Sequence, residues 1–150
     1  MPPPDPRLAS ARAWLRKAEG DLEYGKMGVA SGKDRLAWGV CWHAQQAAEK
    51  ALKAYLAWLG DENIPHTHYL DLLRERVISQ GGEPPSEDKL LPLNRYAPSM
   101  RYPQIGDPAL GEAALALRLA RQVVQAVKQQ IKLENEERRR GSAEAAEERS

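Results

Sequence analysis

Residues 110–131 read LGEAALALRLARQVVQAVKQQI, and this stretch decides the fold class. Its apolar side chains recur at alternating intervals of three and four residues, the spacing of one face of an α-helix. Asp107 and Pro108 precede it as a capping residue and a first-turn proline. The stretch therefore predicts a long amphipathic helix that buries one apolar seam. The seam consists of Leu110, Ala113, Leu117, Ala120, Val124, Val127 and Ile131.

Two more long helices are expected in the first 60 residues. An apolar seam over 8–29 predicts a helix with Asp5 and Pro6 at its start and residues 31–33 at its end. The segment 34–59 predicts a second helix, which is rich in alanine. Because small side chains let neighbouring helices approach closely, we expect this second helix at the centre of a bundle.

Two shorter helices complete the expected architecture. Thr67 is expected to cap a helix that runs through Ile78, and Leu90, Leu93 and Ala97 suggest a short helix after it. No segment alternates apolar and polar residues as a strand does. The sequence therefore predicts an all-α, up-and-down antiparallel bundle of four to five helices, three long and two short.

Composition narrows the class of protein further. The 150 residues are 42% hydrophobic and 29% charged, and no apolar run approaches the ~20 residues of a membrane helix. The start of the chain lacks the basic and apolar regions of a signal peptide, and the single Cys41 cannot form an internal disulfide. A net charge of +1 does not favour bulk electrostatic capture of nucleic acid. We expect a cytoplasmic protein that does not associate with membranes.

The expected domain is one bundle with a tail at each end. Residues 1–6 form a proline-rich arm, 7–133 the bundle and 134–150 a charged tail with six glutamates and four arginines. The apolar seam stops at the start of that tail, so we expect the tail to be frayed or disordered, without a packing partner. Its Arg138, Arg139 and Arg140 are interpreted as part of a solvated helix end.

A polar set on the second helix is the first candidate site. Gln46, Glu49, Lys50 and Lys53 recur at intervals of three and four, so they share one face. One interpretation is a solvated stripe with a Glu49–Lys53 pair that contributes ~0.3–0.5 kcal/mol. The other is a polar platform for a phosphate or a protein partner.

The histidines and the cysteine do not predict a metal site or a nucleophile. His66 and His68 flank Thr67, but a zinc site normally needs three or four ligands, and only His43 remains. We therefore expect local capping there and no metal. Cys41 lies on the apolar seam of the second helix, where it is interpreted as core. Common catalytic patterns are absent, so no catalytic residue and no cofactor are assigned.

A second candidate site lies around an irregular connection near residues 98–103. Arg95 precedes it, and Arg101 and Tyr102 fall within it between two prolines. Guanidinium groups suit phosphates, and a tyrosine ring can stack on a base. Alternatively, the arginines bond loop carbonyls and the tyrosines close one end of the bundle.

Three segments, taken in order, resemble the HEPN family, the higher eukaryote and prokaryote nucleotide-binding domain. They are AWGVCWHAQQAAEKALKA at 37–54, HTHYLDLL at 66–73 and RYP at 101–103, and the resemblance covers about residues 8–132. It implies a helical bundle of four or five helices that commonly dimerises. Many prokaryotic members pair with a separate minimal nucleotidyltransferase, often as a toxin–antitoxin couple. Others are metal-independent ribonucleases with an Arg-x(4–6)-His motif.

The ribonuclease motif can be tested on the sequence directly. An arginine would have to lie within 36–38, 59–61 or 61–63 to pair with one of the three histidines, and none does. Arg35 has seven residues between it and His43, one too many, which places the two about 80° apart around a helix. RNA cleavage is therefore not the favoured interpretation.

The resulting prediction is a non-catalytic HEPN-type homodimer. It would bind a nucleotide or a nucleotidylated partner and work with a nucleotidyltransferase subunit. The alternatives are an atypical ribonuclease toxin that uses a histidine with an arginine, and a purely structural dimerisation module. The candidate binding residues are Gln46, Glu49, Lys50, Lys53, Arg95, Arg101 and Tyr102.

Overall fold

The computed structural model describes residues 5–97 and 106–149, and within them it contains helices and no strand. The long helices are α1 (Pro6–Ala30), α2 (Ala37–Trp58) and α5 (Leu110–Arg149), and the short ones are α3 (Leu70–Ser79) and α4 (Glu87–Asn94). A single 3-10 turn, Asp34–Leu36, joins α1 to α2. The all-α bundle of three long and two short helices is confirmed.

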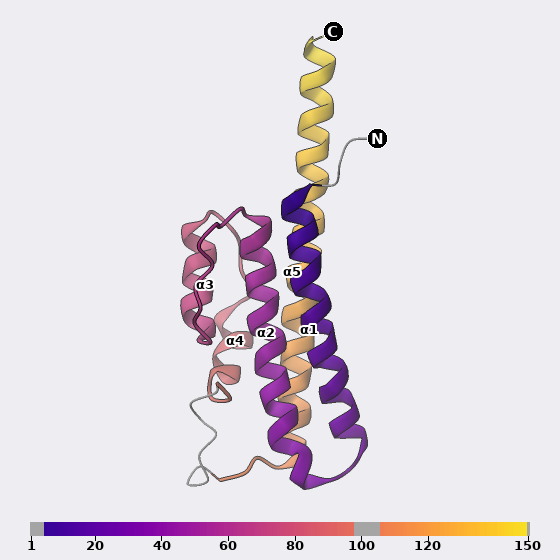
Figure 1. The fold of residues 1–150 in the computed structure, drawn as a ribbon, viewed down its shortest axis with the longest axis vertical. Coiled ribbons are helices and arrows are strands. Elements are labelled where there is room, and N and C mark those ends of the chain that lie inside the picture. The colour runs from indigo at the N-terminus through magenta and orange to yellow at the C-terminus, as the bar shows by residue number, and fades with distance from the viewer. Residues whose placement is uncertain (1–4, 98–105, 150) are drawn as a thin grey trace.

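The helix α2 lies at the centre, as its alanine content predicts. It packs against α1 and α5, and α3 and α4 lie on the side of α2 away from α1 (Figure 1). Of its 22 residues, 17 are buried, so it has almost no solvent face. Among them, Tyr55 and Trp58 are the largest fully buried side chains of the described chain. A helix covered on nearly every side must bury its polar residues as well as its apolar ones.

Two glycines set how closely α1 approaches its neighbours. A Cβ atom at Gly25 would lie 2.6 Å from Leu117 Cδ1 on α5, and one at Gly28 would lie 2.4 Å from Val40 Cγ2 on α2. Both distances are shorter than carbon atoms tolerate. A Cβ atom at either position would force the contacting side chain to shift, and close packing tolerates added volume poorly.

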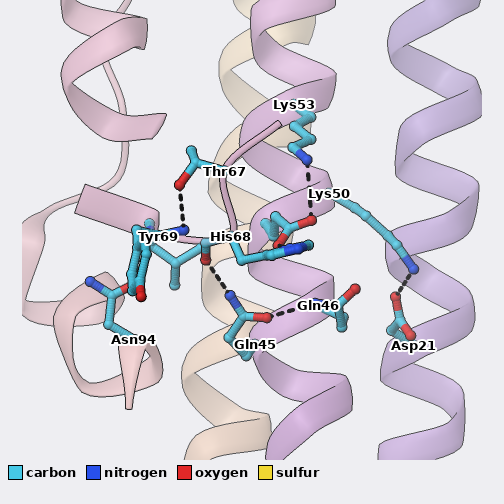
Figure 2. Close-up of polar contacts among 11 residues, drawn as sticks. Asp21, Gln45, Gln46, Lys50, Lys53, Thr67, His68, Tyr69 and Asn94 are labelled. Carbon is cyan, nitrogen blue, oxygen red and sulfur yellow. Dashed lines mark hydrogen bonds and ion pairs between the residues drawn. The ribbon is translucent and has the colours of Figure 1, made fainter. Parts of the chain in front are cut away.

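The start of α3 differs from the sequence prediction. The helix begins at Leu70, three residues beyond Thr67, and the Leu70 N–H donates to Asn94 Oδ1 at 2.7 Å. Thr67 Oγ1 instead accepts from the Tyr69 N–H at 3.1 Å, which closes a turn ahead of the helix (Figure 2). The expected Thr67 cap is therefore wrong. A side chain distant in sequence satisfies the end of the helix, which periodicity along the chain does not reveal.

The C-terminal part of α5 extends beyond the bundle (Figure 1). Its first turn past the apolar seam nevertheless packs. The carboxylate of Glu134 accepts from the Tyr55 hydroxyl and from Trp58 Nε1, the latter at 3.1 Å, and the Arg138 guanidinium lies 4.0 Å from the centre of the Trp58 ring. The expectation that residues from 134 onward have no packing partner is thus wrong for Glu134 and Arg138. Where the stable domain ends remains a prediction.

None of the helices in the described ranges combines the length and the apolar character that crossing a membrane requires.

Candidate functional site

The polar face of α2 is turned inward. Gln46, Glu49 and Lys53 are between 4% and 8% exposed, and Gln45 is fully buried. The interpretation as a solvated stripe is therefore wrong, because α1 and the segment before α3 cover this face. The Glu49–Lys53 pair does form, with Lys53 Nζ 3.2 Å from Glu49 Oε2, but inside the protein. Ionic groups removed from water in this way must satisfy one another.

One cluster joins α2 to α1 and is called here the Asp21 cluster. Asp21 is 6% exposed, and its two oxygens contact two different groups of α2. Oδ1 lies 2.8 Å from His43 Nδ1, and Oδ2 accepts from Lys50 Nζ at 2.5 Å. Figure 2 shows Lys50 reaching across from α2 to Asp21 on α1. One buried carboxylate thus holds an imidazole and an ammonium group side by side.

A second cluster joins α2 to the segment before α3 and is called here the Glu49 cluster. Glu49 Oε1 lies 2.8 Å from His68 Nδ1, and Oε2 contacts Lys53. Gln45 Nε2 donates to the His68 carbonyl at 2.6 Å, and Gln46 Nε2 donates to Gln45 Oε1 at 2.8 Å (Figure 2). The two glutamine amides therefore tie the backbone of His68 to the central helix.

Both clusters fix the same atom of the imidazole. Because a carboxylate can only accept, His43 and His68 each donate from Nδ1. In the neutral ring this leaves Nε2 as a hydrogen-bond acceptor that can meet a ligand. Each cluster thus combines an oriented imidazole with a lysine.

Aromatic rings surround His43. The Tyr24 ring lies parallel to the imidazole, with centroids 5.0 Å apart and an angle of 16° between the planes. The Trp42 ring meets it at 73° with the same centroid separation. His43 is therefore held by a hydrogen bond at Nδ1, by a ring against its face and by a second ring set at a steep angle.

The remaining predicted site residues do not join these clusters. Arg95 is mostly exposed, lies 3.4 Å from Glu112 and places its guanidinium 5.7 Å from the centre of the Tyr96 ring. Together with residues of α4 and α5 it borders a cavity of about 250 Å³. Arg101 and Tyr102 lie outside the described residues.

Sequence reasoning missed Asp21 as the organiser of a cluster. The sequence did contain an indication. Asp21 is adjacent to Leu22, a residue of the apolar seam over 8–29, so its carboxylate is expected close to the buried face of that helix. An acid at such a position needs a cation from a neighbouring helix. The partner could not be chosen without knowing how α1 lies against α2.

Neither a metal site nor a reactive cysteine emerges from the described residues. No group of three or more histidine, cysteine, aspartate or glutamate side chains there has the geometry to hold a metal ion. Burial raises the pKa of the Cys41 thiol to about 11, so it stays protonated at neutral pH. Cys41 is a core residue, in agreement with its place on the seam.

These features define a class: a small antiparallel helical bundle whose central helix carries a buried polar network. The chain belongs to the HEPN domain family, whose model matches residues 11–130. A similar solved structure is the crystal structure of TT1696 from Thermus thermophilus, which is 28% identical in sequence with a TM-score of 0.64. The similarity covers 80% of this chain and 97% of that chain. No match was found among the curated proteins.

Family membership supports a nucleotide-binding or ribonuclease-like helical protein.

Proposed function

We propose that this chain binds a nucleotide, or a nucleotidylated partner, and works beside a separate nucleotidyltransferase in a toxin–antitoxin-like pair. The single observation that carries the proposal is the buried polar network. Asp21, Glu49 and Lys53 are each under 9% exposed in a chain of only 150 residues. Buried ion pairs often contribute no more stability than well-packed apolar residues would. Their presence between the central helix and its neighbours therefore favours a binding role.

The cations of the network are the groups that would meet phosphate. Lys50 is the more accessible, with 24% of its side chain exposed against 10% for Lys53. Asp21 would orient Lys50 and Glu49 would orient Lys53, with Gln46 acting through Gln45. Arg95, Arg101 and Tyr102 would add contacts from the α4–α5 connection. Each lysine is already paired with a carboxylate, so a bound phosphate gains little net charge. This near-neutral charge favours an arrangement in which the nucleotidyltransferase subunit supplies the metal ion and catalyses the reaction.

Calorimetric titration with ATP, with and without a purified minimal nucleotidyltransferase, tests this function. Lys50→Gln and Arg101→Ala should each weaken binding roughly ten- to a hundredfold, because a charge-assisted contact contributes ~1.5–3 kcal/mol. Lys132→Gln is the control, since Lys132 is an exposed lysine on α5. If ATP and the partner both fail to bind the unmutated protein, the proposal is wrong.

A homodimer is part of the same proposal, since HEPN domains often dimerise. Exposed Leu91 on α4 and Leu115 on α5 provide apolar surface for a contact between copies, away from α1. Light scattering at micromolar concentration should give the dimer mass, and a monomer mass would remove this part of the proposal.

A metal-independent ribonuclease is the second candidate, and the geometry of the histidines favours it. A buried carboxylate that accepts from Nδ1 leaves Nε2 able to take a proton from a ribose hydroxyl or return one to a leaving oxygen. An RNA cleavage assay with chelator present separates the two functions. Cleavage that His43→Gln or His68→Gln abolishes would replace the binding module with a nuclease.

A further inference from the structure

We propose that Tyr24 and His43 form a stacking platform for the base of a nucleotide whose phosphate contacts Lys50. The inference rests on the proposed nucleotide-binding function and assigns that function a base-binding subsite between α1 and α2. It includes Tyr24, a residue outside the motifs that identify the family, and it makes the Asp21 cluster the support of the platform.

The first reason is that the imidazole beneath Tyr24 is held in place. The imidazole is fixed by Asp21 at Nδ1 and flanked by Trp42, and Tyr24 lies parallel to it. A ligand that stacks there does not have to order the His43 side chain, so binding does not lose the conformational entropy of that side chain. Parallel rings of this kind extend naturally to a third ring, since every base has a π-face.

The second reason is that the outer part of the platform is accessible. Tyr24 is 64% exposed although one face of its ring packs on His43. The neighbouring Asp21 is buried, so the surface offered to a ligand is aromatic and the carboxylate lies beneath it. A large exposed aromatic ring that is already stacked on one side is suited to a flat partner on the other.

The third reason is the placement of a cation beside the rings. Lys50 lies two helical turns from His43, roughly 10 Å along α2, but its ammonium reaches back to the same carboxylate that holds His43. An ammonium group has three donors, and Asp21 occupies one. The others can meet a phosphate while the base lies on Tyr24. Because Asp21 offsets the charge of Lys50, we expect weak affinity. Because every base has a π-face, we expect little preference among bases.

Substitutions at Tyr24 test the platform by NMR titration with ATP and with adenosine as the phosphate-free probe. Tyr24→Leu should weaken binding of both probes roughly five- to a hundredfold, the range expected for loss of one base–aromatic stack. Tyr24→Phe should restore most of that loss, and Lys50→Gln should weaken ATP but not adenosine. Tyr69→Leu is the matched control, an exposed tyrosine next to α3. Base protons of the bound probes should shift upfield only where position 24 carries an aromatic ring.

The outcomes separate this inference from the function it rests on. If ATP binds the unmutated protein and Tyr24→Leu binds it equally well, the platform is wrong while nucleotide binding stands. The same holds if Tyr24→Phe binds as weakly as Tyr24→Leu, because the hydroxyl and not the ring would then matter. If neither probe binds the unmutated protein at millimolar concentration, the platform and the proposed nucleotide binding both fail.

Discussion

The Asp21 cluster and the Glu49 cluster contain the same three kinds of group but present them differently. In each, a buried carboxylate lies 2.8 Å from a histidine Nδ1 and also holds a lysine. In the Asp21 cluster the lysine is the more exposed of the two lysines, at 24% against 10%. In the Glu49 cluster the imidazole is the more exposed, at 51% against 25%.

The difference follows from what carries each histidine. His43 lies within α2, and its cluster is completed by α1, so two packed helices fix its geometry. His68 lies in the irregular segment before α3 and is tied to α2 through its carbonyl and its ring. The same three kinds of group thus form two different surfaces. The Asp21 cluster is held between two helices and exposes its lysine, whereas the Glu49 cluster is more open and exposes its imidazole.

Removing the charge of each carboxylate should give the largest difference between the clusters. Glu49→Gln leaves Lys53 almost fully buried without its counter-ion, and breaking such a pair costs on the order of 3–5 kcal/mol. Asp21→Asn should cost about 1–3 kcal/mol, because Lys50 can turn toward solvent. Urea unfolding monitored by circular dichroism measures both free energies of unfolding.

Glu19→Gln provides the control for these two variants. Its partner Lys128 and Glu19 itself are both about half exposed, so the loss should stay under about 1 kcal/mol. Equal losses for Glu49→Gln and Asp21→Asn would show that the two clusters are energetically alike, contrary to their different exposure.

A third carboxylate, that of Glu134, can be compared with those of Asp21 and Glu49. Its donors from α2 are neutral groups, whereas each of the other two carboxylates contacts a lysine. It accepts from the Tyr55 hydroxyl and from Trp58 Nε1, both on the fully buried end of α2. A chain ending at residue 133 leaves these donors without their acceptor, at about 1–3 kcal/mol per group. A chain ending at residue 140 keeps them. Calorimetry should give the shorter chain a melting temperature several degrees lower, since 1 kcal/mol corresponds to roughly 2–4 °C at this size.

The full-length chain is the reference for both truncations. The chain ending at residue 140 should melt with it, because the residues beyond are almost entirely exposed. If all three melt together, Glu134 adds nothing and the domain ends at 133, as the apolar seam alone predicts.

The sequence predicted the long helices because a seam of apolar residues records which face of each helix is buried. It placed α2 at the centre because that helix is rich in alanine, whose small side chain lets neighbouring helices approach closely. It could show that Gln46, Glu49 and Lys53 share a face, but not whether water or protein covers that face. Whether the face is covered depends on α1 and on the segment before α3. The apolar seam of α1 shows which of its own faces is buried but not which residues of α2 it covers, and the segment before α3 carries no periodic signal.

The candidate site was therefore only partly predictable. Lys50 and Glu49 were identified as polar residues on α2, whereas Asp21 was hidden among the residues of another helix and Tyr24 lay outside every motif. The motif-bearing Arg101 and Tyr102 fall outside the described residues, so their roles stay predictions. Pairings between helices depend on the rotation of each helix about its axis, which a single sequence does not fix.

The smallest expected effect concerns the segment that carries His68. Asn94 accepts from the Leu70 N–H at 2.7 Å and donates to Asp71 at 2.8 Å, so it secures the start of α3 from the end of α4. Asn94→Ala should cost about 0.5–2 kcal/mol, as loss of a helix cap does, while Thr67→Ala should cost a few tenths at most. Because His68 lies just before α3 and His43 does not, Asn94→Ala should shift the imidazole NMR resonances of His68 and leave those of His43 in place. A larger loss for Thr67→Ala than for Asn94→Ala would restore Thr67 as the cap, and equal shifts at both histidines would show that the two clusters respond as one unit.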